Sequence, residues 1–207
     1  MLTGFTAALI LITLSELGDK TFFISLLLAT RLPRLWVFMG SISALAAMTL
    51  ISVLLGQIIG GIPEIWVQIT VVTLFLGFGV KLLYTASCIS APLGCSEADE
   101  AETVVARASQ DWNPRWSHLG LSTGLQAFSL TFLGEWGDRT QISTIALSTT
   151  HTPVAVTLGA VLGHGICAGI AVLSGRWIAG YLSERLLTAL GGSLFLFFGI
   201  LSWIDGI

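Results

Sequence analysis

Long runs of apolar residues fill most of this chain, and short polar, glycine- or proline-containing stretches separate them. The runs cover residues 2–30, 35–59, 65–85, 118–148, 153–174 and 185–204. A transmembrane helix needs about 20 predominantly apolar residues, so each run is long enough to cross a bilayer. The second run is rich in glycine, serine and alanine, which let helices approach closely in membranes. The pattern predicts an all-α membrane protein with six transmembrane helices.

The stretch from residue 86 to residue 117 differs from the rest because it is polar and mainly acidic. Carboxylates occupy four of the six positions from 97 to 102. We expect a cytoplasmic acidic linker with a short helix over 97–110, between a first segment (1–85) and a second (118–207). Cys88 and Cys95 raise the alternative of a metal-sensing loop, against the plainer interpretation of a solvated acidic linker.

The composition strengthens the membrane interpretation. Hydrophobic residues make up 54% of the chain and charged residues only 10%, and the mean hydropathy is +0.89. A soluble domain carries about 25% charged residues. Three cysteines do not indicate a disulfide framework. Because the chain shows no nucleophile–base pair and no cofactor motif, we expect neither an enzyme nor a bound cofactor, and no nucleic-acid partner.

The two halves of the chain are related by an offset of 119 residues. Glu16 aligns with Glu135, and Asp19 aligns with Asp138. The glycines and threonine at 18, 21, 40 and 56 likewise align with those at 137, 140, 159 and 175. Repeats with an odd number of spans insert in opposite orientations, as in many secondary transporters with a site at mid-membrane. The sequence therefore predicts two inverted three-helix repeats.

The positive charges in the predicted loops are distributed unevenly. One side of the membrane would carry Arg31, Arg34, Arg107, Arg115, Arg176 and Arg185. The opposite side, with both termini and the loops near Glu64 and His151, carries no lysine or arginine. Loops rich in lysine and arginine remain in the cytoplasm. We therefore expect the linker to be cytoplasmic and both termini to be non-cytoplasmic.

A short polar motif interrupts the apolar run in each half. The two copies are LSELGDKT (14–21) and LGEWGDRT (133–140), both versions of Glu-x-Gly-Asp-(Lys/Arg)-Thr. Ionisable side chains at such depth are costly and mark ion or substrate pathways. Inverted halves would bring the two glutamates and two aspartates together near the pseudo-twofold axis. Oxygen-only ligation suits hard divalent ions such as Ca²⁺, Mg²⁺ and Mn²⁺.

The charges and glycines of the motifs suggest how such a site would work. Gly18 and Gly137 precede the aspartates, where glycine permits close helix approach or a local break. Four carboxylates with Lys20 and Arg139 give a formal charge of −2, which one divalent cation or two protons would neutralise. Because a low-dielectric site penalises net charge, metal and protons should compete, as in an antiporter. The alternative is a purely structural pairing of Lys20 and Arg139 with the preceding glutamates.

Six further polar residues are candidates for a supporting role. They are Thr21, Thr140, Gln57, Gln141, Ser43 and His164. On a continuous helix the threonines would point away from the glutamates, so they are ligands only if the helix breaks. The glutamines and the serine would complete a coordination shell or form hydrogen bonds between helices. For the mid-span histidine, a proton-relay role competes with ordinary packing.

The doubled motif in a chain of three plus three predicted helices resembles the Golgi-type calcium/manganese:proton antiporter family. The copy ELGDKTFF, beginning at Glu16, is most similar to the cyanobacterial manganese exporters. The resemblance covers both halves but not the linker. It implies export of Mn²⁺ or Ca²⁺ from the cytosol in exchange for protons. It also implies that Glu16, Asp19, Glu135 and Asp138 are essential.

We therefore expect a secondary transporter that exports Mn²⁺, with Ca²⁺ as a second ion, against protons. The choice of Mn²⁺ rests on the resemblance alone. The partners would be the ion, protons and the lipid bilayer of a thylakoid or plasma membrane. Two alternatives stay open. One is an exporter of a small organic cation such as a basic amino acid, and the other is a membrane assembly protein that transports nothing.

Overall fold

All regular structure in the described part of the chain is helical. The structure, a computed structural model, describes residues 2–61, 63–88, 96–111, 120–174 and 184–205. The helices are α1 (Leu2–Glu16), α2 (Lys20–Arg31), α3 (Arg34–Ile59), α4 (Glu64–Cys88), α5 (Ser96–Asp111), α6 (Gly120–Gly134), α7 (Arg139–Thr150), α8 (Pro153–Ser174) and α10 (Glu184–Asp205). Helices α3, α4, α8 and α10 are long and apolar enough to cross a membrane. The predicted all-α class is confirmed.

The first and fourth predicted spans are each two helices and not one. The chain leaves the helix after Glu16 and re-enters it at Lys20, and the second half repeats this between Gly134 and Arg139. The glycine in each break has φ +82, a left-handed conformation that glycine adopts without steric cost. The aspartates that follow have almost identical backbone angles, φ −76 and ψ 169 against φ −74 and ψ 168. The repeat is therefore visible in the backbone of the breaks.

Helix packing is reciprocal between the two halves. At Gly40, α3 lies against α6, where an added Cβ would lie 2.9 Å from Cβ of Ala127. At Gly159, α8 lies against α1, where an added Cβ would lie 3.1 Å from Cβ of Ala8. The two glycines are 119 residues apart, and so are the two alanines. The same close contact, which only glycine permits, is thus built twice.

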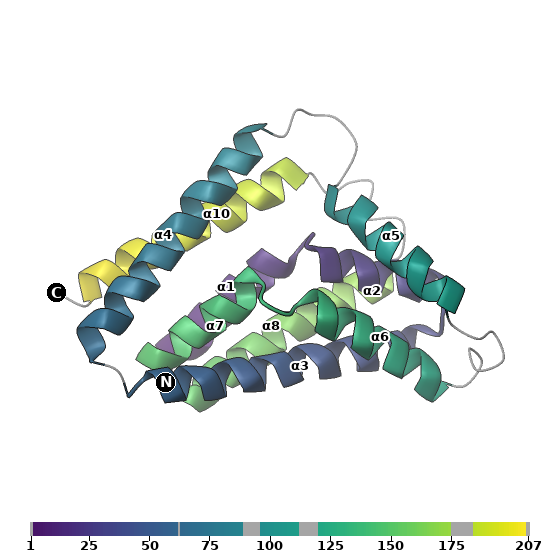
Figure 1. The fold of residues 1–207 in the computed structure, drawn as a ribbon, viewed down its shortest axis with the longest axis horizontal. Helices are drawn as coiled ribbons and strands as arrows, with labels where there is room; N and C mark the ends of the chain where they lie inside the picture. Colours follow the sequence, from purple (N-terminus) through teal and green to yellow (C-terminus); the bar gives the residue numbers. More distant parts are fainter. Residues whose placement is uncertain (1, 62, 89–95, 112–119, 175–183, 206–207) are drawn as a thin grey trace.

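Helices α4 and α10 pack side by side and stand apart from the other long helices (Figure 1). Phe75 of α4 meets Phe195 of α10 edge to face, with ring centroids 5.7 Å apart. These two phenylalanines are 120 residues apart, so each contacts its own equivalent. An added Cβ at Gly79 would meet Leu196, and one at Gly199 would meet the equivalent Leu76. Such an exchange of partners is what a twofold relation between α4 and α10 requires.

The linker helix α5 lies along α2 (Figure 1). Its observed bounds agree with the predicted helix over 97–110. Ala101 and Val105 are buried in a core cluster with Phe22 and Phe23 of α2, while Glu102 on another face of α5 is exposed. The interpretation of the linker as merely solvated is therefore wrong for α5, which packs against the helical body through one apolar face.

Many large apolar side chains lie exposed on the outer faces of the long helices. Examples on α3 and α8 are Leu50, Leu54, Ile58, Leu158 and Leu162. A soluble protein rarely exposes large contiguous apolar surface, whereas a bilayer requires it. This distribution fits an integral membrane protein.

Candidate metal centre

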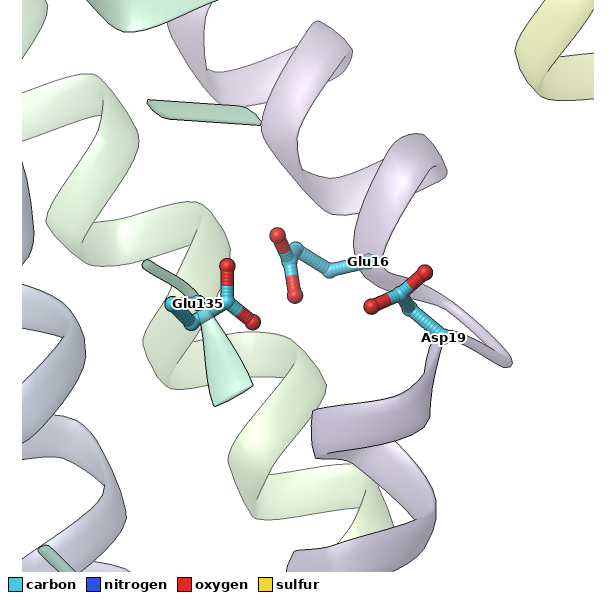
Figure 2. A group of neighbouring side chains, drawn as sticks. All are labelled: Glu16, Asp19 and Glu135. Carbon is cyan, nitrogen blue, oxygen red and sulfur yellow. The ribbon is translucent and has the colours of Figure 1, made fainter. Parts of the chain in front are cut away.

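The two breaks bring three carboxylates from different halves of the chain together. One oxygen from each of Glu16, Asp19 and Glu135 lies within 4.8 Å of the others, and Figure 2 shows the three side chains pointing toward one another. Glu16 and Glu135 are each only 2% exposed. Oxygens that bind one divalent ion at about 2.1–2.5 Å lie within about 5 Å of each other. The cluster therefore has the size and chemistry of a divalent cation site.

The geometry of the breaks explains why these side chains meet. Each glutamate comes where the first helix stops, and its carbonyl oxygen accepts a hydrogen bond from the aspartate amide three residues later, at 3.1 Å in both halves. The intervening glycine turns the chain, so the aspartate begins the next helix. In the second half, the amide of Gly137 also donates to Oε1 of Gln141 at 2.7 Å. Gln141 thus stabilises the break through its side-chain oxygen.

The fourth motif carboxylate, Asp138, lies at the edge of the cluster. Its Oδ1 is 3.7 Å from Nε of Arg139, and its Oδ2 lies 3.5 Å from the hydroxyl of Thr140. Its side chain is 25% exposed, against 10% for Asp19. The predicted four-carboxylate group is thus three carboxylates in close contact with a fourth beside them.

The motif bases do not pair with the glutamates that precede them. Nη2 of Arg139 donates to Oδ1 of Asp19, in the other half, at 2.6 Å. Nζ of Lys20 instead pairs with Oε2 of Glu100 on α5, at 3.2 Å. The alternative of intrahelical pairs is wrong because the helix is broken between each glutamate and its base. Nothing in the two motif copies distinguishes the two bases.

Lys20 is thereby removed from the charge balance of the cluster. The four carboxylates and the guanidinium of Arg139 carry a formal charge of −3 when ionised, because Glu100 balances Lys20. The earlier count of −2 assumed that both bases face the site. The stronger negative charge increases the attraction for a cation and for protons.

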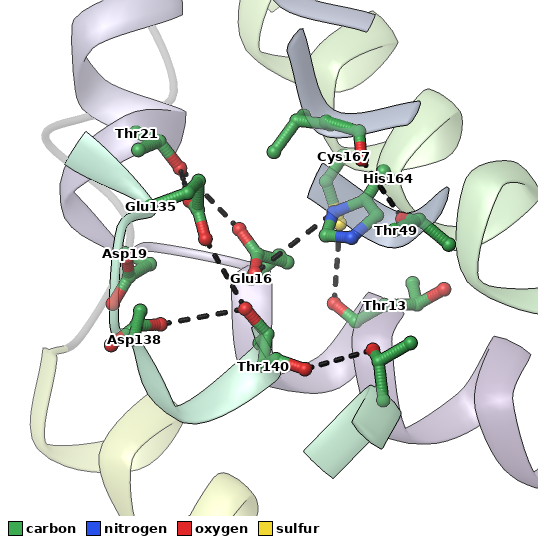
Figure 3. Close-up of polar contacts among 12 residues, drawn as sticks. Thr13, Glu16, Asp19, Thr21, Thr49, Glu135, Asp138, Thr140, His164 and Cys167 are labelled. Atoms are coloured by element: carbon green, nitrogen blue, oxygen red, sulfur yellow. Dashed lines mark hydrogen bonds and ion pairs between the residues drawn. The ribbon is translucent and has the colours of Figure 1, made fainter. Parts of the chain in front are cut away.

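Both motif threonines point at the carboxylates, as expected if the helix breaks (Figure 3). Thr21 donates to Oε1 of Glu135 at 2.6 Å, with Oε2 of Glu16 a more distant acceptor at 3.4 Å. Thr140 donates to Oε2 of Glu135 at 3.2 Å. Glu135 therefore receives one hydroxyl from each half, which holds its carboxylate in place between the two breaks.

His164 on α8 lies beside the cluster, next to Glu16. Its Nδ1 is 3.9 Å from Oε1 of Glu16, and both side chains are buried. A space of about 10 Å³ next to His164 is lined by Glu135, Thr140 and His164 together with polar side chains of α3 and α7. Among these, Thr49, Ser52 and Thr144 are site neighbours that sequence reasoning missed, because they belong to no motif.

Two of the predicted supporting residues lie away from the carboxylates. Gln57 donates to the backbone carbonyl of Ser148 at 2.8 Å, and Ser43 donates to the carbonyl of Gly40 in its own helix at 2.9 Å. Both hydrogen bonds serve helix structure or packing, so neither residue is part of the cluster. Cys88 is exposed, and Cys95 lies outside the described residues, so the structure leaves the metal-sensing loop untested.

Two cavities lie on opposite sides of the aromatic contact between α4 and α10. The larger, about 700 Å³, is lined by α1, α4, α7 and α10 and reaches Phe75. The smaller, about 110 Å³, reaches Phe195 and is lined by Asp19, Arg139 and Glu97 of α5. The smaller cavity connects the cluster with the end of the molecule where α5 lies. Glu97 was not expected near the site, since the sequence placed it in a solvated linker.

Comparison with known proteins agrees with this geometry. The family profile described as "Divalent cation/proton antiporter GDT1" matches residues 4–89 and 123–207. The chain is 49% identical over 205 residues to GDT1-like protein sll0615 of Synechocystis sp. (strain ATCC 27184 / PCC 6803 / Kazusa), covering 98% of both chains. It is 40% identical over 202 residues to GDT1-like protein 3 of Oryza sativa subsp. indica, covering 95% of this chain and 72% of the relative.

A third relative is a plant protein whose name describes it as chloroplastic. The chain is 37% identical over 213 residues to Protein PAM71-homolog, chloroplastic, of Arabidopsis thaliana, covering 95% of this chain and 58% of the relative. No solved structure matches the chain. Both halves lie in the matched region, and both motifs lie within it. The chain belongs to the GDT1 family of divalent cation/proton antiporters and is a transporter, not an enzyme.

Proposed function

We propose that this protein exports Mn²⁺, with Ca²⁺ as a second ion, from the cytosol in exchange for protons. Glu16, Asp19, Glu135 and Asp138 would form one site that the two halves share. The observation that carries the proposal is the approach of three carboxylate oxygens from both motifs to within 4.8 Å in a buried position. Buried carboxylates in such contact need a cation or protons to offset their charge.

The proposal includes six membrane crossings in two inverted repeats, residues 1–85 and 118–207. Besides the four long helices, the broken pairs α1–α2 and α6–α7 would each make one crossing. The reciprocal glycine contacts, the equal break geometry and the contact of Phe75 with Phe195 support it. Broken helices are tolerated at membrane depth where they line an ion site.

The orientation of the protein follows from the arginines at one end of the helical body. Arg31, Arg34, Arg107 and Arg185 belong to the ends of α2, α3 and α10 and to α5. With the positive side in the cytoplasm, α5 and the smaller cavity are cytosolic. The larger cavity and both termini then lie on the outer or lumenal side of a plasma or thylakoid membrane.

The arrangement provides a route for exchange. Metal would enter past Glu97 and Asp19 through the cytosolic cavity and displace protons from the carboxylates. After the site opens toward the other side, protons would displace the metal and return with the empty site. Exchange of one divalent ion for two protons leaves the charge of the cluster unchanged.

The size of the site favours a metal ion over an organic cation. The spaces that touch the carboxylates measure about 110 and 10 Å³, whereas small-molecule pockets measure about 300–1,000 Å³. The oxygens are close enough to bind one atom, and they leave no room for a basic amino acid in this conformation.

Transport by purified protein in liposomes tests the proposal. Vesicles with an internal metal-sensitive dye and an imposed pH gradient should take up Mn²⁺ when wild-type protein is present. The variants Glu16→Gln and Glu135→Gln should each abolish uptake, and the exposed Glu102→Gln on α5 should not. Uptake that persists in either site variant would show that the halves do not share one site, and an uptake rate that does not respond to the size or direction of the pH gradient would contradict antiport.

A further inference from the structure

Four buried side-chain atoms have no hydrogen-bond partner among the described residues: Oγ1 of Thr13, Oγ of Ser15, Oε1 of Glu16 and Nδ1 of His164. The last two lie beside the carboxylate cluster, 3.9 Å from each other. His164 is 4% exposed and Glu16 is 2% exposed. A buried polar atom without a partner costs about 1–3 kcal/mol. Two such atoms pointing at one another indicate that a third group belongs between them.

The distance between the two atoms limits what this group can be. It is too long for a direct hydrogen bond, which spans about 2.7–3.2 Å. Two ligands of one divalent metal ion, each at about 2.1–2.5 Å from it, lie about 3–5 Å apart. A metal ion shared by Glu16 and His164 therefore fits the spacing, and so does one bridging water.

The surrounding polar side chains favour a cation. Thr49, Ser52 and Thr144 line the small space beside His164, and each donates its hydroxyl hydrogen to a carbonyl in its own helix at 2.8 Å. Their oxygens can therefore only accept from, or bind to, what enters the space. These three hydroxyls therefore present only lone pairs to the space, whereas Gln141, which also lines it, accepts from the amide of Gly137 through Oε1 and contributes a side-chain amide that can donate.

The neighbourhood of His164 leaves its ring nitrogen available. Cys167, one turn further along α8, directs its thiol to the carbonyl of Thr13 at 3.2 Å (Figure 3). Arg139 is engaged by Asp19. The equivalent of His164 in the first half is Leu45, 119 residues earlier. Only one half of the repeat therefore supplies a nitrogen to the site.

We propose that Nδ1 of His164 is a ligand of the transported metal, together with Oε1 of Glu16, and that it selects Mn²⁺ over Ca²⁺. Imidazole nitrogen binds transition metals well, whereas Ca²⁺ takes oxygen ligands almost exclusively. The carboxylates alone would attract either ion. This inference rests on the proposed function, because it concerns the same site.

Paramagnetic resonance of Mn²⁺ bound to the purified protein tests the assignment directly. Wild-type protein should show hyperfine coupling from a ¹⁴N nucleus bound to Mn²⁺, and His164→Gln should lose it. The matched control is His151→Gln, since His151 bonds to Thr150 at the end of α7. That variant should keep the coupling. His164→Leu introduces the residue found at the equivalent position of the first half, Leu45. It should also lose the coupling, which would show that the loss is not caused by glutamine itself.

Equilibrium binding and transport separate the possible outcomes. In His164→Gln the dissociation constant for Mn²⁺ should rise by at least about tenfold, while that for Ca²⁺ changes less than about twofold. Absence of nitrogen coupling in the wild type, or equal losses for both ions, would overturn the assignment and leave a water-bridged histidine. If the protein shows nitrogen coupling but binds Mn²⁺ without exporting it, the proposed export function is rejected, whereas the assignment of His164 as a metal ligand stands.

Discussion

At the scale of single residues, the structure separates two bases that the motifs make equivalent. Arg139 crosses to Asp19 in the other half of the chain, whereas Lys20 turns to Glu100 on α5. A guanidinium bonded to a mostly buried carboxylate lowers the cost of its charge, and an exposed ammonium–carboxylate pair contributes little. The two bases therefore have different tasks, one at the ion site and one between α2 and the linker.

This difference gives a prediction for matched variants. Arg139→Gln leaves Asp19 without its ionic partner inside the cluster and should reduce Mn²⁺ transport by about tenfold or more, since breaking such a pair costs more than about 1.4 kcal/mol. Lys20→Gln breaks only the half-exposed pair and should reduce it less than about fivefold. Initial uptake rates in liposomes measure both. Equal losses would mean that Lys20 enters the site during transport.

The same residues show what the sequence could and could not provide. The identity of the four carboxylates followed from the repeated motif and the apolar runs around it. The partners of the motif residues did not follow, because Glu100, which pairs with Lys20, and His164, which lies beside Glu16, come from segments with no motif and reach them only through tertiary packing. For Gln57 and Ser43 the sequence left an ion-binding role and a hydrogen bond within or between helices both open, because a polar residue in an apolar helix can serve either; in this structure both form the hydrogen bond.

At the scale of helices, each break depends on one glycine in a left-handed conformation. Hydrophobic pattern does not distinguish a span from two half-helices, because both halves remain apolar. The glycine in each motif allows the helix to break at this position but does not require it to do so. The buried face of α5 was predictable from the sequence, because Ala101 and Val105 are buried and residues four positions apart lie on the same face of a helix. The many acidic residues around Ala101 and Val105 favoured the prediction of a solvated linker instead.

The glycines permit a prediction that compares the two breaks. Alanine at either position requires a strained backbone that costs about 1–3 kcal/mol. An added Cβ at Gly18 would also collide with Leu187, whereas one at Gly137 would meet nothing within 4 Å. Gly18→Ala should therefore lower the unfolding temperature and the transport rate more than Gly137→Ala does.

The control for both variants is Gly77→Ala. Gly77 lies within α4 with nothing within 4 Å of an added Cβ, so alanine there should be neutral or slightly stabilising. Thermal unfolding in detergent should show a loss of about 2–4 °C per kcal/mol of destabilisation. A Gly137→Ala protein as stable as the control would show that the break does not need its left-handed residue.

At the scale of the whole molecule, metal and protons share one cluster, so their binding must be linked. Carboxylates bind metal when deprotonated, and the affinity for Mn²⁺ should therefore fall as pH falls. If two protons leave for each metal bound, the dissociation constant rises by up to about 100-fold per unit decrease in pH. Titration of purified protein with Mn²⁺ between pH 6 and pH 8 measures the slope.

Transport under a clamped membrane potential checks the same stoichiometry independently. Exchange of one divalent ion for two protons moves no net charge, so the rate at a fixed pH gradient should not depend on potential. Exchange for one proton moves a charge worth about 2.3 kcal/mol per 100 mV. A steep dependence on potential would reject the two-proton cycle, even if antiport itself is observed.

The two cavities on either side of Phe75 and Phe195 differ in size although the helices around them are related by the repeat. The space on the proposed outer side measures about 700 Å³ and the cytosolic one about 110 Å³. Helix α5 has no counterpart in the repeat, and its Glu97 lines the smaller space. In the proposed orientation, the outer cavity is the larger one, but only the cytosolic cavity is lined by residues of the cluster, Asp19 and Arg139.

Opening of the cytosolic cavity should then close the outer one, because α4 and α10 line both. Gln68 and Thr188 are equivalent positions, 120 residues apart, and line the outer and cytosolic cavities respectively. In a protein whose three native cysteines are replaced, Gln68→Cys should react rapidly with a polar thiol reagent when Thr188→Cys reacts slowly. Conditions that slow the first, such as saturating Mn²⁺ or a change of pH, should speed the second. Labelling rates that rise or fall together would mean that opening of one cavity does not close the other. A movement of elements other than the α4–α10 pair would then have to expose the ion site to the two sides of the membrane in turn.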